Sequence, residues 1–172
     1  MHPNAQQVAA RLTDLGVAGE VRVLAEAAPT AATAAAQLNC VVGAIANSLI
    51  FTVSHSDSDD PTPLLVLTSG AHRVDTTRIA TLLAEHTDGH GIATLPRVRQ
   101  ATPEFVRTHT GQPIGGVAPV GHPVPVPTFV DTWLKEHEVV WAAGGHPHTV
   151  FPTTFAELLR ITEASVADVG AD

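Results

Sequence analysis

The chain has 172 residues, of which 44% are hydrophobic and 15% are charged. This size and composition are those of one globular domain with its own core, and they exclude an intrinsically disordered chain. The formal net charge of -8 excludes an extended grip on a nucleic-acid backbone, because such a grip depends on many lysines and arginines. If RNA is bound, we expect the contact to be confined to one end of it or to a small patch.

The cysteine content and the hydropathy of the chain indicate the cellular compartment in which it is expected. Cys40 is the only cysteine, so no internal disulfide can form. Its neighbours are apolar, and we interpret it as a small buried hydrophobe rather than a catalytic thiolate. No apolar run approaches the roughly 20 residues that cross a bilayer, and the N-terminus lacks the features of a signal peptide. A cytoplasmic location is therefore expected.

The first third of the chain alternates helix and strand signals. Apolar residues at spacings of three and four predict a helix over residues 4–15. A short strand is predicted over 20–24. An alanine-rich helix follows over 30–38, with Thr30 or Thr33 as its N-cap.

The middle of the chain predicts a hairpin and two helices. β-branched and aromatic residues favour a strand over 46–53, and a second strand over 64–68 follows a long acidic loop. Asp75 caps a third predicted helix. A fourth, shorter helix is predicted over 103–108.

The last third predicts strands and one more helix. Strands are expected over 129–133, 138–142 and 149–151. A Thr-x-x-Glu capping box at Thr154 opens a last amphipathic helix. The acidic tail, 163–172, is expected to fray.

Two loops are rich in glycine and proline. Residues 111–127 hold five prolines and four glycines, which rule out a helix or a central strand. The segment is either an ordinary connection or a loop that presents backbone groups to a ligand. Residues 143–148 have the same character. Exposed N–H groups on such loops can form an oxyanion hole or bind a terminal ribose and phosphate.

Several kinds of catalytic site can be weighed by motif. His146 and His148 could chelate a metal if they lay on one face of a strand, with His122 elsewhere. No His-Glu-x-x-His motif, cysteine pair or adjacent acidic ligand supports them, so we expect no metal. The chain also lacks the Gly-x-Ser-x-Gly elbow of serine hydrolases and the phosphate-binding Gly-x-x-x-x-Gly-Lys-Ser/Thr loop.

The order of several segments resembles the YbaK/prolyl-tRNA-synthetase-associated editing domains. The resemblance runs over about residues 20–162 and is carried by residues 47–51, 65–70, 73–75, 111–121 and 144–145. It implies a single domain over 1–172 of α+β class, with a curved, barrel-like, mostly antiparallel mixed sheet surrounded by helices. The helix over 4–15 and the acidic tail would flank its core.

The resemblance also implies a function. Members of the family hydrolyse the ester of mischarged tRNA, removing alanine, cysteine, serine or threonine, for example from tRNA(Pro), without a metal or other cofactor. The implied partners are the 3′ acceptor end of aminoacyl-tRNA and, transiently, an aminoacyl-tRNA synthetase, with no DNA and no membrane. Two alternatives stay open: a catalytically impaired homologue that binds aminoacyl-tRNA ends or a related small molecule, and a histidine-based metal-dependent hydrolase.

The family's Gly-x-x-x-Pro loop corresponds to residues 115–119. Its backbone is implied to grip the ester and stabilise the oxyanion, while water, helped by the neighbouring ribose hydroxyl, attacks. The catalytic residues expected on this basis are Asn47, Gly115, Gly116 and Pro119. The expected substrate-binding residues are Ser48, Ser69, Arg73, Ala118, Gly121, His122, Gly144, Gly145, His146 and His148.

One departure concerns Asn47. Many family members carry a lysine at this place, immediately before the Ser-Leu-hydrophobic-Phe strand. An amide can orient a water or a ribose hydroxyl, but it cannot carry a positive charge. The substrate is therefore altered, catalysis is lost, or Arg73 or His146 supplies the charge. A histidine at 122, 146 or 148 could also act as a base.

Overall fold

The computed structural model describes residues 1–56, 60–87 and 95–171. Its centre is an eight-stranded sheet in the order β1-β8-β7-β2-β3-β6-β9, with β5 pairing with β2 off this path. These strands are β1 (Arg22–Val23), β2 (Ile45–Ser54), β3 (Thr62–Ser69), β5 (Arg97–Gln100), β6 (Thr128–Asp131), β7 (Val140–Ala143), β8 (Thr149–Thr153) and β9 (Ser165–Ala167). Two short strands, β4 (Arg73–Val74) and β10 (Gly170–Ala171), pair separately.

The sheet is mixed. β2 pairs antiparallel with β3 and β5, and β8 pairs antiparallel with β1 and β7. The pairs β2–β7, β3–β6 and β6–β9 are parallel. This confirms the expected α+β class and mixed sheet. The strand order has two ends, so the sheet is not closed into a barrel.

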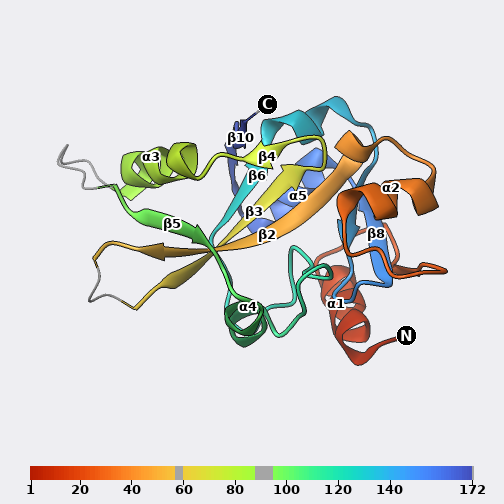
Figure 1. The fold of residues 1–172 in the computed structure, drawn as a ribbon. Coiled ribbons are helices and arrows are strands. Elements are labelled where there is room, and N and C mark those ends of the chain that lie inside the picture. Colours follow the sequence, from red (N-terminus) through yellow and green to blue (C-terminus); the bar gives the residue numbers. More distant parts are fainter. Residues whose placement is uncertain (57–59, 88–94, 172) are drawn as a thin grey trace.

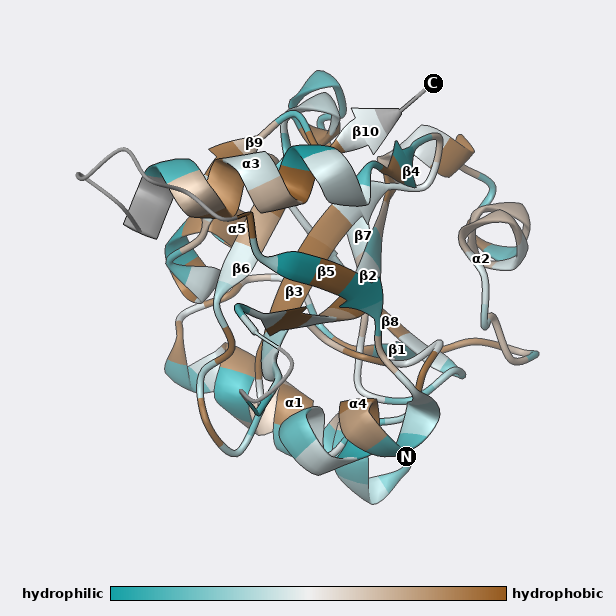
Figure 2. Cartoon of the chain, turned by 60° about the vertical axis from the view of Figure 1, so that its left-hand side comes forward, coloured by the Kyte–Doolittle hydropathy of each residue, from teal (hydrophilic) through white to brown (hydrophobic). Residues whose placement is uncertain are grey.

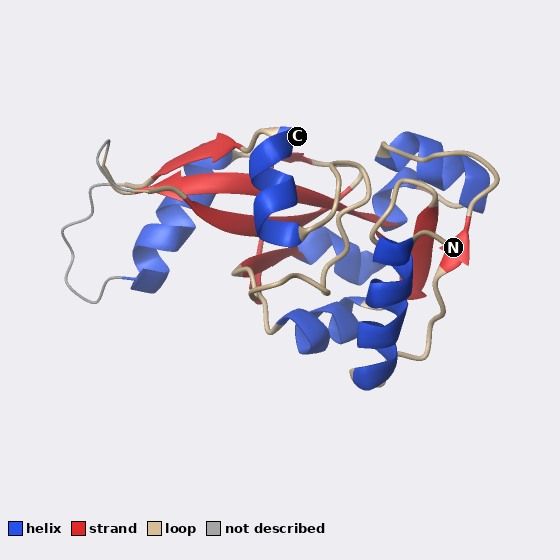
Figure 3. Ribbon diagram, turned by 90° about the horizontal axis from the view of Figure 1, so that it is seen from below, coloured by secondary structure: helices blue, strands red, loops and turns tan. Residues whose placement is uncertain are grey.

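In the part of the chain that the structure describes, five α-helices surround the sheet. They are α1 (Pro3–Asp14), α2 (Ala31–Leu38), α3 (Thr76–Thr87), α4 (Pro103–Thr110) and α5 (Phe155–Thr162). Two 3₁₀ turns, η1 (Val42–Ala44) and η2 (Thr132–Glu136), precede β2 and follow β6. In Figures 1 and 2, α3 lies on one side of the β2–β3 hairpin, and α1 and α4 lie on the other. Figure 3 shows the strands and helices from below.

The two faces of β3 bury two separate cores. Leu65 and Leu67 point to the larger core, which also takes side chains from α1, α4 and α5. Leu64 and Val66 point to the other face and pack with α3. Successive strand residues face opposite sides of a sheet, so an unbroken apolar run is the pattern of a strand buried on both faces.

The helix signals in the sequence are confirmed. Thr30 accepts a hydrogen bond from Thr33 N in a capping box, and Thr102 accepts one from Phe105 N. Asp75 Oδ1 accepts from the N–H groups of Thr77 and Arg78. Thr154 caps α5 by accepting from Glu157 N, but the expected capping box is incomplete, because the Glu157 carboxylate accepts from Thr153 Oγ1 instead. Such caps offset the unpaired N–H groups of a first turn.

Two predictions for the C-terminal part are wrong. The strand expected over 129–133 ends at Asp131, whose carboxylate accepts from Trp133 N and caps η2 instead. The tail does not fray after α5, because β9 pairs with β6 and β10 pairs with β4. The buried Ala167 and Val169 anchor this segment in the second core. The acidic residues of the tail led to the prediction of fraying, although the tail also contains these two apolar residues.

Other features differ in smaller ways. β5 was not predicted, since its sequence, Arg-Val-Arg-Gln, has a single apolar residue. The tip of the acidic hairpin loop, 57–59, lies outside the described residues. Cys40 is half-buried beside α2, and burial raises the pKa of its thiol, which disfavours the thiolate. No helix among the described residues is long and apolar enough to cross a membrane.

Candidate active site

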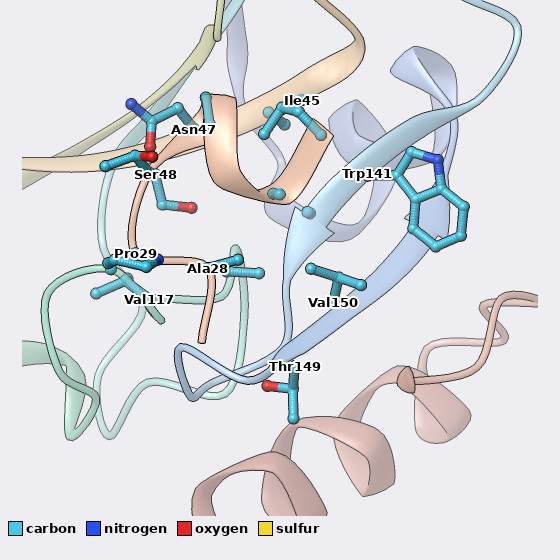
Figure 4. A pocket seen from close by; sticks show the side chains of 16 residues that line it. Ala28, Pro29, Ile45, Asn47, Ser48, Val117, Trp141, Thr149 and Val150 are labelled. Atoms are coloured by element: carbon cyan, nitrogen blue, oxygen red, sulfur yellow. The ribbon is translucent and has the colours of Figure 1, made fainter. Parts of the chain in front are cut away.

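A small cavity of about 30 Å³ lies at the start of β2. Ala31 and Ala34 of α2 form one wall, and Trp141 of β7 and Val150 of β8 form another. Asn47 and Ser48 line it from β2, and Figure 4 shows the Ser48 hydroxyl pointing toward it and the Asn47 amide pointing away, with Pro29 and Val117 nearby. The alanines of α2 leave space where larger side chains would fill it. The lining is therefore mostly apolar, and its polar members are Thr30, Asn47, Ser48 and Thr149.

A larger cavity of about 380 Å³ adjoins the small one. Asn47, Ser48 and Val117 line both, so these three residues mark the boundary. The exposed Arg73 also lines the larger cavity and is a cation available at its edge. The volume of the larger cavity lies within the range of small-molecule sites in proteins.

Ser48 carries an unused hydroxyl at this boundary. Its Oγ is buried and has no hydrogen-bond partner among the described residues. An unpaired buried hydroxyl costs stability, and such exceptions commonly mark a place that a ligand or water completes. A substrate atom spanning the two cavities would provide the missing partner.

Residues 111–121 form a loop wrapped around the buried side chain of Gln112. Gln112 Oε1 accepts from Ala118 N at 2.6 Å, and Gln112 Nε2 donates to Val120 O at 3.3 Å. Gly116 N donates to Pro113 O. The N–H groups of Gly115 and Val117 make no hydrogen bond with any residue in the described ranges, and both residues line the small cavity. We take these two N–H groups as the candidate donors to a ligand.

The loop after β7 supports this arrangement from behind. Pro147 O accepts from Ala28 N, and His148 O accepts from Leu24 N, so the loop is tied to the segment that forms the cavity wall. A Cβ on Gly116 would lie 2.6 Å from the carbonyl carbon of His146. The two glycine-rich loops thus meet backbone to backbone, and any side chain at position 116 would separate them.

The structure brings some predicted site residues together and separates others. Asn47, Ser48, Gly115 and Arg73 border the paired cavities, and Gly116 lies behind them. Pro119, Gly121 and His122 instead line a third cavity of about 280 Å³ with Arg11 and Glu163. The remaining predicted residues have structural partners: Ser69 Oγ donates to Gly43 O, Ala118 is fully buried, Gly144 N donates to Thr149 O, and Gly145 packs on Val8.

The histidines proposed as charge carriers lie away from this boundary. His122 Nε2 lies 2.8 Å from Ala118 O, and burial lowers the His122 pKa while that hydrogen bond partly raises it. The ring of His146 stacks between those of His2 and His148. Partial burial, and then the nearby His2 and His148, lower the pKa of His146. Both histidines therefore favour the neutral form at neutral pH.

Sequence reasoning missed a buried cluster beside the larger cavity. Asp131 Oδ2 lies 2.9 Å from His72 Nδ1 and also accepts from Ser69 N, while its Oδ1 accepts from Trp133 N. Among the described residues, His72, Asp131 and Asp168 form the one group of three with metal-ligand spacing. However, Asp131 is already engaged on both oxygens, and Asp168 forms an ion pair with Arg78. The cluster therefore acts as a cross-link between β3 and η2.

The sequence also did not predict which segments form the walls of the small cavity. The alanine-rich helix is evident in the sequence, but its role as a cavity wall is not. Alanine indicates a helix by its propensity, but it does not indicate which other segment the helix packs against. Trp141 lies in a segment expected to be a strand, and its side chain direction follows from the register of β7 against β2.

Comparisons with known proteins show which family and fold this chain resembles. Residues 25–161 match the family model of the aminoacyl-tRNA editing domain. A crystal structure of a candidate trans-editing enzyme for prolyl-tRNA synthetase is 36% identical, with a TM-score of 0.85 over 100% of this chain and 99% of that one. A scaffold protein from an epitope-grafting study is 33% identical, with a TM-score of 0.82 and the same coverage. A hypothetical protein is 25% identical, with a TM-score of 0.81 over 96% of this chain and 99% of that one.

Proposed function

Because this chain belongs to the aminoacyl-tRNA editing domain family, we propose that it hydrolyses the ester of aminoacyl-tRNA carrying a small, wrongly attached amino acid. The observation that carries the proposal is the pair of cavities meeting at Asn47, Ser48 and Val117. The similarity to a candidate trans-editing enzyme for prolyl-tRNA synthetase supports tRNA(Pro) as the carrier and a transient association with a synthetase.

The two cavities divide the substrate between them. The small cavity, about 30 Å³ and lined mostly by apolar side chains, suits a small amino-acid side chain such as that of alanine. The larger cavity receives the terminal adenosine, and Arg73 lies where it can meet a phosphate. Only the acceptor end enters the protein, which agrees with the net charge of -8.

The ester then lies at the boundary between the cavities. Water attacks its carbonyl carbon, and the N–H groups of Gly115 and Val117 donate to the developing oxyanion. One such donor can lower the barrier by about 3 kcal/mol. The carbon–oxygen bond to the ribose breaks, and the leaving oxygen takes a proton to restore the ribose hydroxyl. Free amino acid and uncharged tRNA are the products.

Asn47 and Ser48 act as positioning groups in this scheme. The Asn47 amide can both donate and accept, so it can orient the attacking water or the neighbouring ribose hydroxyl without adding charge. The amide in place of a lysine also favours the second candidate function, a homologue that binds aminoacyl-tRNA ends without turnover. The two functions differ in whether the ester is cleaved.

A panel of mischarged tRNAs carrying alanine, serine, cysteine or threonine separates them. We expect wild-type protein to release alanine fastest from tRNA(Pro), Asn47→Ala to lower kcat, and Asn47→Lys to retain hydrolysis. Binding of each tRNA without release of any amino acid would establish the binding-only homologue instead. Loss of hydrolysis with a chelator, restored by zinc, would indicate a metal-dependent hydrolase.

A further inference from the structure

Three histidine rings form a stacked array at the surface beside the candidate site. The His146 ring lies 4.4 Å from that of His2, with 24° between the planes, and 5.5 Å from that of His148, with 22° between the planes. His2 is exposed, while His146 and His148 are half-buried. The array therefore ends in an aromatic ring that reaches solvent.

Two hydrogen bonds hold the rings in position. His2 Nδ1 accepts from Asn4 N and caps α1, and His146 Nδ1 accepts from His148 N at 3.2 Å. These hydrogen bonds fix the orientation of the His2 and His146 rings. The array is thus an aromatic surface in a chain without tyrosine and with few other aromatic residues.

The array adjoins the wall of the small cavity, which Ala28 lines. The backbone of His146 packs against Gly116, and the carbonyl groups of Pro147 and His148 accept from Ala28 and Leu24. The 146–148 loop lines neither cavity, but it adjoins Gly116, whose neighbours Gly115 and Val117 line the small one. It is there that the loop offers a stacking surface to RNA whose terminal adenosine occupies the larger cavity.

We propose that the array of His2, His146 and His148 is a stacking platform for a nucleobase of the acceptor strand next to the terminal adenosine. The proposal rests on the proposed function, since it requires the acceptor end to enter the cavities. Stacking suits this acidic protein because every base has an aromatic face, and the contact needs no lysine or arginine. It would lengthen the grip on the RNA beyond the single nucleotide in the cavity.

Matched substitutions at His2 test the platform. His2→Asn keeps an acceptor for capping α1 but removes the ring, whereas His2→Phe keeps a ring but removes the acceptor. His55→Asn removes an exposed histidine from the end of the β2–β3 hairpin and serves as the control. The substrates are alanyl-tRNA(Pro) and the adenosine ester of alanine, which has no neighbouring nucleotide.

We expect His2→Asn to raise KM for alanyl-tRNA about fivefold, the effect of losing one base stack at the low end of the measured range. His2→Phe and His55→Asn should match wild type. All variants should cleave the adenosine ester equally, because it does not reach the platform. Equal KM values for His2→Asn and wild type on alanyl-tRNA would overturn the proposal, as would an equal loss on both substrates.

Binding of an uncharged oligonucleotide ending in CCA, compared with adenosine alone, gives a readout independent of hydrolysis. If the platform exists, His2→Asn weakens binding of the oligonucleotide and leaves adenosine unaffected, even if no ester is ever cleaved. A loss that disappears as salt increases would instead identify a phosphate contact. In that case stacking is contradicted while the proposed function stands.

Discussion

The hydroxyl of Ser48 is buried at the boundary of the two cavities, where no described residue bonds to it. Ser69 provides a contrast, since its hydroxyl is equally hidden but donates to Gly43 O at 2.7 Å. The Ser48 hydroxyl is unpaired in the described part of the chain, and we propose that it bonds to the substrate, whereas the Ser69 hydroxyl stabilises the fold. The same substitution should therefore have opposite consequences at the two positions.

Ser48→Ala should leave the free energy of unfolding unchanged or slightly higher, because it removes an unsatisfied polar group. It should lower kcat/KM for deacylation about tenfold, the loss of one hydrogen bond to substrate. Ser69→Ala should lower the free energy of unfolding by about 1 kcal/mol. Denaturant unfolding and single-turnover deacylation measure the two effects. Loss of stability in Ser48→Ala would show that its hydroxyl has a structural partner.

His122 makes the stability depend on pH. Its pKa is lowered from 6.5 in the folded state, mainly by burial, so the unfolded chain binds more protons below that pH. Stability should therefore fall as the pH drops through about 6.5 towards the lower folded value. Thermal unfolding at about pH 7.5 and about pH 5.5 measures the difference. His122→Gln should reduce it, whereas His55→Asn should keep the wild-type difference.

At the scale of elements, α2 and the start of β2 define the small cavity. Ile45 contributes a buried side chain both to its lining and to the core under α2. Ile45→Val removes one methylene there, while Ile161→Val removes the same group from a similarly buried position on α5. Each should cost about 0.5–1.5 kcal/mol of stability.

The two valine variants should differ in specificity. Ile45→Val should increase hydrolysis of the serine or threonine ester relative to the alanine ester by about tenfold, since one methylene of pocket volume is worth about 1–3 kcal/mol. Ile161→Val should keep the wild-type ratio. Competition assays with pairs of mischarged tRNAs measure it. An unchanged ratio for Ile45→Val would place the amino acid elsewhere.

Local sequence signals predicted most of the elements and little of their arrangement. The helices could be predicted because their signals are local. The caps at Thr30, Thr102 and Thr154 are hydrogen bonds to residues three positions further along the chain. The end of β6 at Asp131 could not be predicted, because the Asp131 carboxylate both caps η2 and accepts from the N–H of the distant Ser69. β9 and β10 likewise exist through pairing with distant strands.

The same distinction explains the candidate site. Asn47 and Gly115 could be singled out from the resemblance to the family, and the structure places both at the small cavity. The walls from α2, β7 and β8 could not, because their convergence depends on the parallel pairing of β2 with β7. Pro119 and His122 belong to the same loop as Gly115, yet the bend around Gln112 directs them to another cavity.

At the scale of the whole molecule, the net charge of -8 limits how RNA is held. Binding should release few counterions, so the logarithm of affinity for tRNA should fall with the logarithm of salt with a slope no steeper than about −2. Arg73→Gln, which removes a cation at the larger cavity, should make that slope shallower by about one. Titrations between about 50 and about 200 mM salt measure both values. A steep slope would imply an extended phosphate-binding surface.

The insertion of β7 between β8 and β2 also determines the order in which this protein can fold. The hairpin of β2 and β3 can form early, but one edge of β2 stays open until Trp141 and Ala142 pair beside Ile45 and Ala46. The other edge of β3 likewise stays unpaired until β6 is available. Contacts between such distant segments slow folding and expose strand edges meanwhile. During synthesis on the ribosome, the sheet would therefore close only after residues 128–153 have emerged, and with it the candidate site.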